Sequence, residues 1–129
     1  MKRNMDLIRS LLLKLEALDL SPGEIATLDP DDEELRVEGS GPDEIEHHLY
    51  LIDEAGFIDT AGGGTFDGLT FRKLTWEGYD FLDSVRDDRI WARTKQGASE
   101  AGGYTVELLK DLAKGFVRKQ IEEKTGIRL

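Results

Sequence analysis

Leucines recur at helical spacing near the start of the chain. They follow one another at intervals of four, four and three positions, as Leu7, Leu11, Leu15 and Leu18. This spacing places them on one face, so we predict a helix from Arg3 to Leu18 that buries one side. The tripeptide Ser-Pro-Gly at 21–23 should end it, because proline is disfavoured inside a helix and glycine favours a turn.

The segment from 24 to 41 has weak signals. Residues 24–28 are compatible with one helical turn, and 35–37 with a short strand. Pro30 and the acidic run Asp29 to Glu34 interrupt any longer periodic pattern. We therefore expect no full helix here, but a shortened helix or the strand.

A well-bounded helix is predicted from Pro42 to Ala55. Proline at the first helical position needs no amide partner, and Gly56 is typical of a left-handed C-cap. Acidic residues in the first turn suit the positive end of the helix dipole. The inner face should consist of Ile45, His48, Leu49 and Ile52.

The next stretch predicts a two-stranded hairpin. Phe57 and Ile58 begin one strand, and residues 69–74 return as the second. The glycine-rich segment 61–68 between them favours a loop. Together they would form a wing beside the preceding helix.

Two or three helices are expected in the rest of the chain. Thr75 is a plausible N-cap for a helix from Trp76 to about Val85, and Ile90 and Trp91 continue its pattern as one kinked helix or two. Residues 97–103 are predicted as a loop, with a helical turn through Ala98 and Glu100 as the alternative. The last helix, 105–124, has an apolar side that can cover the core or pair with a second copy: Leu109, Leu112, Ala113, Phe116 and Ile121.

The order of these elements predicts an α+β fold that is mainly helical. Helix, short strand, helix, wing, helix and terminal helix follow one another as in a winged-helix-like arrangement. With 129 residues, we expect one domain over 1–129, with a core at 1–95 and an added C-terminal helix at 104–125.

The formal net charge of −10 is unevenly distributed. Residues 20–71 hold the acidity, and no lysine or arginine occurs from 42 to 71. The chain lacks cysteine, an apolar run of membrane-spanning length and the pattern of a signal peptide, so we expect a cytoplasmic protein.

The charge pattern favours a protein partner over nucleic acid. A DNA-reading helix needs cations, because phosphate contacts supply much of the affinity. We therefore predict a non-catalytic interaction or regulatory module, whose acidic surface meets a basic protein or mimics the charge of nucleic acid: Asp31, Asp32, Glu33, Glu34, Asp43, Glu44 and Glu46. The alternative is a winged-helix DNA-binding regulator that uses Arg72, Lys73, Arg89 and Arg93, although neighbouring carboxylates make ion pairs the simpler interpretation of these cations.

No metal, cofactor or catalytic site is predicted. His47 and His48 are adjacent on a helix and diverge by about 100°, so both cannot face one metal. The acidic run lacks calcium-loop spacing, and no nucleophile and base can be paired. The aromatic residues are typical of cores or interfaces, with simple packing the favoured interpretation: Trp76, Tyr79, Trp91 and Tyr104.

Several segments together resemble a known family. HHLYLIDEAGFI, LTWEGYDFLD and RDDRIW, with the opening and terminal helices, are similar to a bacterial and prophage family of uncharacterised proteins, a domain of unknown function. The resemblance implies a compact soluble protein and brings no catalytic residues. HHLYLIDEAGFI followed by LT and then EG is also similar to the reading helix and wing of winged-helix regulators, which supports the fold more than the function.

Overall fold

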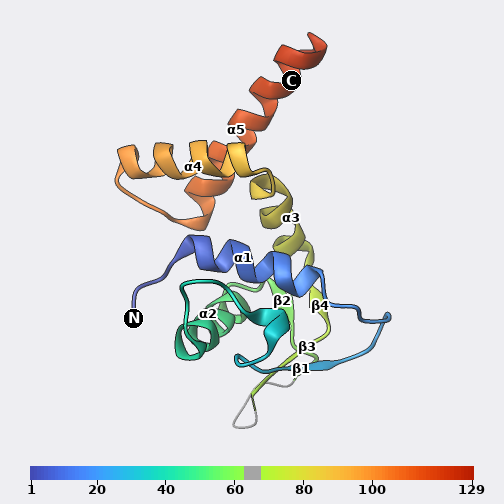
Figure 1. The fold of residues 1–129 in the computed structure, drawn as a ribbon. Coiled ribbons are helices and arrows are strands. Elements are labelled where there is room, and N and C mark those ends of the chain that lie inside the picture. The colour runs from blue at the N-terminus through green and yellow to red at the C-terminus, as the bar shows by residue number, and fades with distance from the viewer. Residues whose placement is uncertain (63–67) are drawn as a thin grey trace. The chain divides into compact units, whose positions relative to one another are not determined.

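The structure, a computed structural model, describes residues 1–62 and 68–129 (Figure 1). The chain divides into two compact units, Met1–Tyr79 and Asp80–Leu129. The boundary falls inside helix α3, Trp76–Val85. The fold is α+β and mainly helical, as predicted. The expectation of a single domain with a core at 1–95 stays a prediction.

The first unit contains two long helices, α1 (Met5–Glu16) and α2 (Pro42–Glu54). Asn4 caps α1, where its side chain accepts a hydrogen bond from the N–H of Leu7 at 3.2 Å. The predicted leucine stripe is confirmed along the helix, although Leu18 lies just beyond its end. The stripe forms part of the core, with Leu7, Leu11, Leu12 and Leu15 at most 2% exposed.

His48 joins these two helices. Its side chain is fully buried, its Nδ1 lies 2.8 Å from the carbonyl of Glu44, and its Nε2 accepts a hydrogen bond from the N–H of Asn4 at 2.8 Å. With Nδ1 as the donor, both ring nitrogens are satisfied. The predicted inner face of α2 is confirmed, and His48 belongs to its centre.

Two antiparallel strand pairs lie below α1 in Figure 1. Strand β1 (Ala26–Leu28) pairs with β3 (Leu69–Phe71), and β2 (Ile58–Asp59) pairs with β4 (Lys73–Leu74). The predicted hairpin is therefore present at its base. Most of its predicted loop lies outside the described residues.

A β-bulge separates β3 from β4. Phe71 and Leu74 are both 2% exposed although three positions separate them, which a regular strand does not allow. The N–H of Arg72 donates to the carbonyl of Asp59 at 2.9 Å, and Lys73 is the register partner of the same residue. Two residues thus oppose one, and the expectation of one uninterrupted strand at 69–74 is wrong.

Two expectations between 24 and 41 are also wrong. The strand is Ala26–Leu28, where a helical turn was expected, because it pairs with β3 far along the sequence. The expected strand at 35–37 is instead the end of a 3-10 helix, η1 (Glu33–Leu35). Leu35 is 2% exposed and holds this turn against the core. The segment therefore contains both a short strand and a short helical turn, each at a different place from the one expected.

The start of α3 is held against the hairpin by a small group of hydrogen bonds. The hydroxyl of Thr75 donates to the carbonyl of Gly56 and accepts from the N–H of Gly78 at 3.1 Å. The N–H of Thr75 donates to the carbonyl of Phe57 at 3.0 Å. The predicted caps are confirmed, since Gly56 has a φ of 77° at the end of α2 and Thr75 caps α3. We call residues 56, 57, 75 and 78 the hairpin clamp.

The second unit contains α4 (Asp88–Ala101) and α5 (Val106–Thr125), which pack against each other. Helices α3 and α4 are separate, because α3 ends at Val85 and Asp87 caps α4. The last helix begins at Val106, one position after the predicted start, and Thr105 caps it. None of the helices in the described ranges combines the length and apolar character needed to cross a membrane.

The predicted loop at 97–103 is wrong up to Ala101, and its alternative, a helical turn through Ala98 and Glu100, is confirmed, because α4 continues to Ala101. Gly97 does not break the helix, and it faces α5: a Cβ there would lie 3.4 Å from the side chain of Leu112, an ordinary van der Waals contact. Ala98 beside it is fully buried. The turn comes only at Gly102, whose φ of 85° ends the helix.

Candidate interaction surfaces

Charge is divided between the two units. The first unit has seven basic and 18 acidic residues, a formal charge of −11, whereas the second has ten and nine, a charge of +1. The acidic residues proposed to bind a partner therefore all belong to the first unit.

The acidic run and the start of α2 come together in the first unit. Asp31 and Asp32 line a shallow groove of about 160 Å³ with Pro42 and Ile45 of α2, and Arg36 lies at the same groove. All four acidic residues at 31–34 are exposed. The predicted acidic surface is thus built from two neighbouring segments.

The outward face of α2 is also acidic. Asp43, Glu46 and Glu54 are exposed on it, while Glu44 is half-buried. Tyr50, 36% exposed, lies in the middle of this face. Sequence reasoning missed Tyr50, although its spacing of four from Glu46 and from Glu54 places it on the same side.

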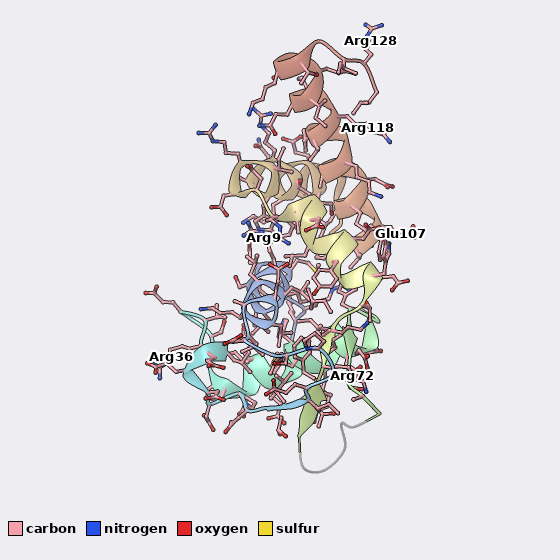
Figure 2. The ribbon with its side chains drawn as sticks, turned by 90° about the vertical axis from the view of Figure 1, so that its right-hand side faces the viewer. Arg9, Arg36, Arg72, Glu107, Arg118 and Arg128 are labelled. Atoms are coloured by element: carbon pink, nitrogen blue, oxygen red, sulfur yellow. The ribbon has the colours of Figure 1, made fainter. Side chains whose placement is uncertain are left out.

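The four cations proposed for nucleic acid belong to different units. Arg72 and Lys73 are in the first unit, and Arg89 and Arg93 are in the second. Figure 2 shows Arg36 and Arg72 on opposite sides of the first unit. Arg36 therefore does not extend the pair of cations formed by Arg72 and Lys73.

Some of the neighbouring cations have partners in the structure. The guanidinium of Arg86 lies 2.7 Å from the carboxylate of Asp83, and Lys95 lies 5.8 Å from the ring centre of Trp91. Arg72 lies 3.6 Å from the carboxylate of Asp59, an ion pair longer than a hydrogen bond.

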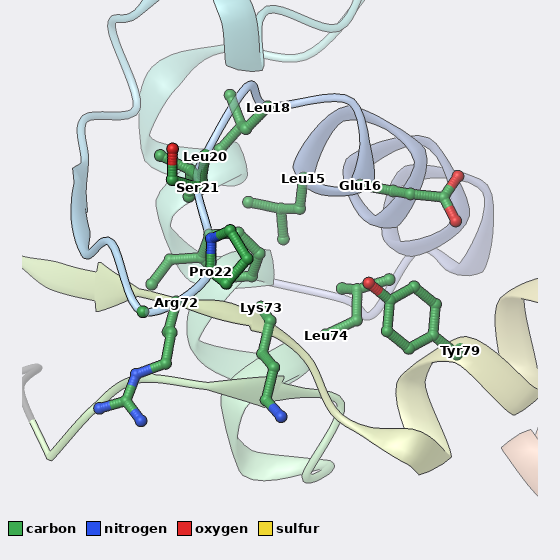
Figure 3. A pocket seen from close by; sticks show the side chains of 12 residues that line it. Leu15, Glu16, Leu18, Leu20, Ser21, Pro22, Arg72, Lys73, Leu74 and Tyr79 are labelled. Carbon is green, nitrogen blue, oxygen red and sulfur yellow. The ribbon is translucent and has the colours of Figure 1, made fainter.

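A larger groove of about 500 Å³ lies where the segment after α1 passes the bulge (Figure 3). Leu15, Leu18, Leu20 and Pro22 line one side. The other side consists of Phe71 to Leu74, with Tyr79 at the end. Sequence reasoning missed this groove, because its walls are about fifty positions apart and the bulge has no local signal.

The aromatic residues divide between core and surface. Trp91 is 4% exposed, so the packing interpretation holds there. It is wrong for Trp76, which is 81% exposed at the start of α3. Tyr79 and Tyr104 are 41% and 44% exposed, so neither is a core residue.

The structure offers no evident metal cluster. Over 1–62 and 68–129, no group of three histidine or carboxylate side chains lies close enough to hold an ion. His47 and His48 have ring centres 5.4 Å apart and planes at 84°, an edge-to-face contact. The ring nitrogens of His48 bond to the backbone.

Comparisons with known proteins place this arrangement in a family. The model of a family described as "Hypothetical protein (DUF2513)" matches residues 2–104. An "Uncharacterized protein" of Haemophilus influenzae is 30% identical over 124 residues, which covers 94% of this chain and 99% of that protein. No solved structure matches. The chain belongs to the DUF2513 family.

Proposed function

We propose that this protein is a non-catalytic interaction module whose first unit is a winged-helix-like scaffold turned to protein binding. The partner is a basic protein, and the acidic surface at 31–34 and on the start of α2 recognises it. The order of α1, β1, η1, α2 and the hairpin supports the scaffold, because a winged helix has the same sequence of elements.

One observation carries the proposal. The helix that would enter a major groove in a winged-helix protein is α2, and its outward face presents Asp43, Glu46 and Glu54 around Tyr50. No lysine or arginine occurs from 42 to 71. Carboxylates on this face repel phosphates and attract a cationic partner, and the exposed tyrosine supplies contact area.

Binding of a defined basic peptide tests this function. An unstructured arginine- and lysine-rich peptide should bind, with an affinity that falls as salt is raised. Neutralising the run with Asp31→Asn, Asp32→Asn, Glu33→Gln and Glu34→Gln should weaken binding by about tenfold or more, because four charges are lost at the contact.

A matched variant separates a local surface from net charge alone. Four exposed carboxylates of the second unit can be neutralised for the same change in charge: Glu100→Gln, Glu107→Gln, Asp111→Asn and Glu123→Gln. This variant should bind the peptide as the wild type does. Equal weakening by both variants would refute a specific acidic surface.

The element order also favours a second candidate, a DNA-binding regulator that uses Arg72 and Lys73 of the hairpin or Arg89 and Arg93 of α4. A phosphate-dependent binder should hold duplex DNA at about 50 mM salt and lose it steeply by about 200 mM. Such binding, abolished by Arg89→Glu or Arg93→Glu, would replace the protein-binding function.

A further inference from the structure

We propose a second docking site, in the groove beside β4, that binds an extended segment of a partner protein carrying aliphatic and carboxylate side chains. This site lies entirely within the first unit. It is independent of the acidic surface and of the function proposed for that surface.

The floor of the groove suits aliphatic side chains. Leu15, Phe71 and Leu74 form the floor and are at most 2% exposed. Leu18 and Leu20 are half-buried on the wall, and Pro22 lies at the rim. The volume of about 500 Å³ falls within the range of about 300–1,000 Å³ that is typical of ligand sites.

Two exposed aromatic residues extend the apolar surface. Tyr79 lines the groove, and Trp76 lies three positions earlier on the same helix, a spacing that places the two on one side. Solvent-exposed tryptophan and tyrosine are the usual anchors of protein interfaces. The hairpin clamp fixes the first turn of α3, so both rings are positioned before a partner arrives.

Charge indicates which partner segment fits. Arg72 and Lys73 line the groove side by side, because the bulge places both between the buried Phe71 and Leu74 (Figure 3). Arg72 already lies 3.6 Å from the carboxylate of Asp59, and Glu16 lines the same groove. The exposed ammonium group of Lys73 is therefore the cation that selects a carboxylate of the partner segment.

The sheet favours an extended conformation for that segment. Strand β4 pairs only with β2 in the described ranges, whereas β1 pairs with β3. The unpaired edge of β4 runs beside the turn at 21–23, and both line the groove. An edge of this kind accepts a further strand through main-chain hydrogen bonds.

A pair of synthetic peptides tests the proposal. The first is a decapeptide that alternates leucine with glutamate, and the second replaces each glutamate with lysine. Titrations followed by the backbone amide shifts of the full chain should show the first peptide moving residues 20–23 and 72–74. Lys73→Glu and Trp76→Ala should each weaken this binding by about tenfold, whereas Lys114→Glu and Tyr104→Ala, exposed in the second unit, should not.

Several outcomes would overturn the proposal. The first peptide could fail to bind at millimolar concentration, or Lys73→Glu could leave its affinity unchanged. The lysine peptide could move the same groove amides as strongly. Shifts caused by the lysine peptide on α2 alone would instead report on the acidic surface, so the two proposals fail separately.

Discussion

At the scale of single residues, Gly78 determines how closely α3 approaches the hairpin. A Cβ at this position would lie 2.1 Å from the carbonyl oxygen of Phe57 and 3.0 Å from its carbonyl carbon. Both are backbone atoms that cannot rotate away. Gly78→Ala should therefore destabilise the fold by about 3 kcal/mol, the upper end of overpacking costs, as measured by urea unfolding.

Gly115 provides the matched control, since it lies inside α5 and a Cβ there meets nothing within 4 Å. Gly115→Ala should stabilise the protein by roughly 0.5–1 kcal/mol, because alanine loses less backbone entropy in a helix. If the two substitutions had the same effect, the close approach at Gly78 would not be the cause.

At the scale of elements, the start of α4 depends on a titrating cap. The carboxylate of Asp87 accepts hydrogen bonds from the N–H groups of Ile90 and Arg89, both at 2.9 Å. The bond from Ile90 is the main cause that lowers the pKa of Asp87 below its ordinary value of 3.8. The bond from Arg89 and the charges of Arg89 and Lys124 act in the same direction, and desolvation opposes them.

This shift predicts a loss of stability in acid. Because the pKa is lower in the folded chain, ionised Asp87 contributes fully above the unfolded value of about 3.8, and the contribution disappears as pH falls through the folded value. Asp87→Ala should lower the melting temperature by a few degrees at neutral pH. The difference in melting temperature between Asp87→Ala and the wild type should become smaller below about pH 4.

Asp87→Asn is the control, because asparagine keeps an acceptor for the cap but does not titrate there. Its melting temperature should be close to that of the wild type at neutral pH and should not share this acid loss. A gap between wild type and Asp87→Ala that stays constant down to about pH 2 would show that the charge is not responsible.

Elements with local signals were predictable. Pro42 and Gly56 bound α2, and Thr105 precedes α5, because caps and turns depend on neighbours in the chain. Strand β1 could not be predicted from the sequence, since its partner residues in β3 lie more than forty positions away. The end of α4 stayed open between a loop and a helical turn, because a glycine such as Gly97 is compatible with both.

The candidate sites divide in the same way. Counting charges was enough to find the acidic surface, because its members are close in sequence. The groove required the bulge at Arg72 and the passage of residues 18–23 beside it. The bulge and this passage form only in the folded chain, so the spacing of residues along the sequence does not predict them.

At the scale of the whole molecule, α5 is the element most suited to joining two copies. The family model ends at residue 104, before this helix begins. Leu109 and Ala113 are buried, whereas Leu112, Phe116 and Ile121 keep part of their surface exposed. We expect the mass in solution to rise with concentration toward twice the 14.5 kDa of one chain.

Light scattering after size exclusion measures this mass. Phe116→Glu should keep the protein monomeric, because it places a charge in the apolar contact, while Arg118→Glu, exposed on the opposite side of the helix, should not. A strict monomer at high concentration would exclude pairing through α5.

The hairpin clamp predicts where the chain tolerates insertions. It fixes both strands at their base through residues 56, 57, 75 and 78, independently of the chain between them. Lengthening a chain segment between two fixed ends costs only about 0.6 kcal/mol for each doubling of its length. Insertions between 62 and 68 should therefore leave the fold of the first unit intact. An affinity tag or a fluorescent label can be introduced at the same place.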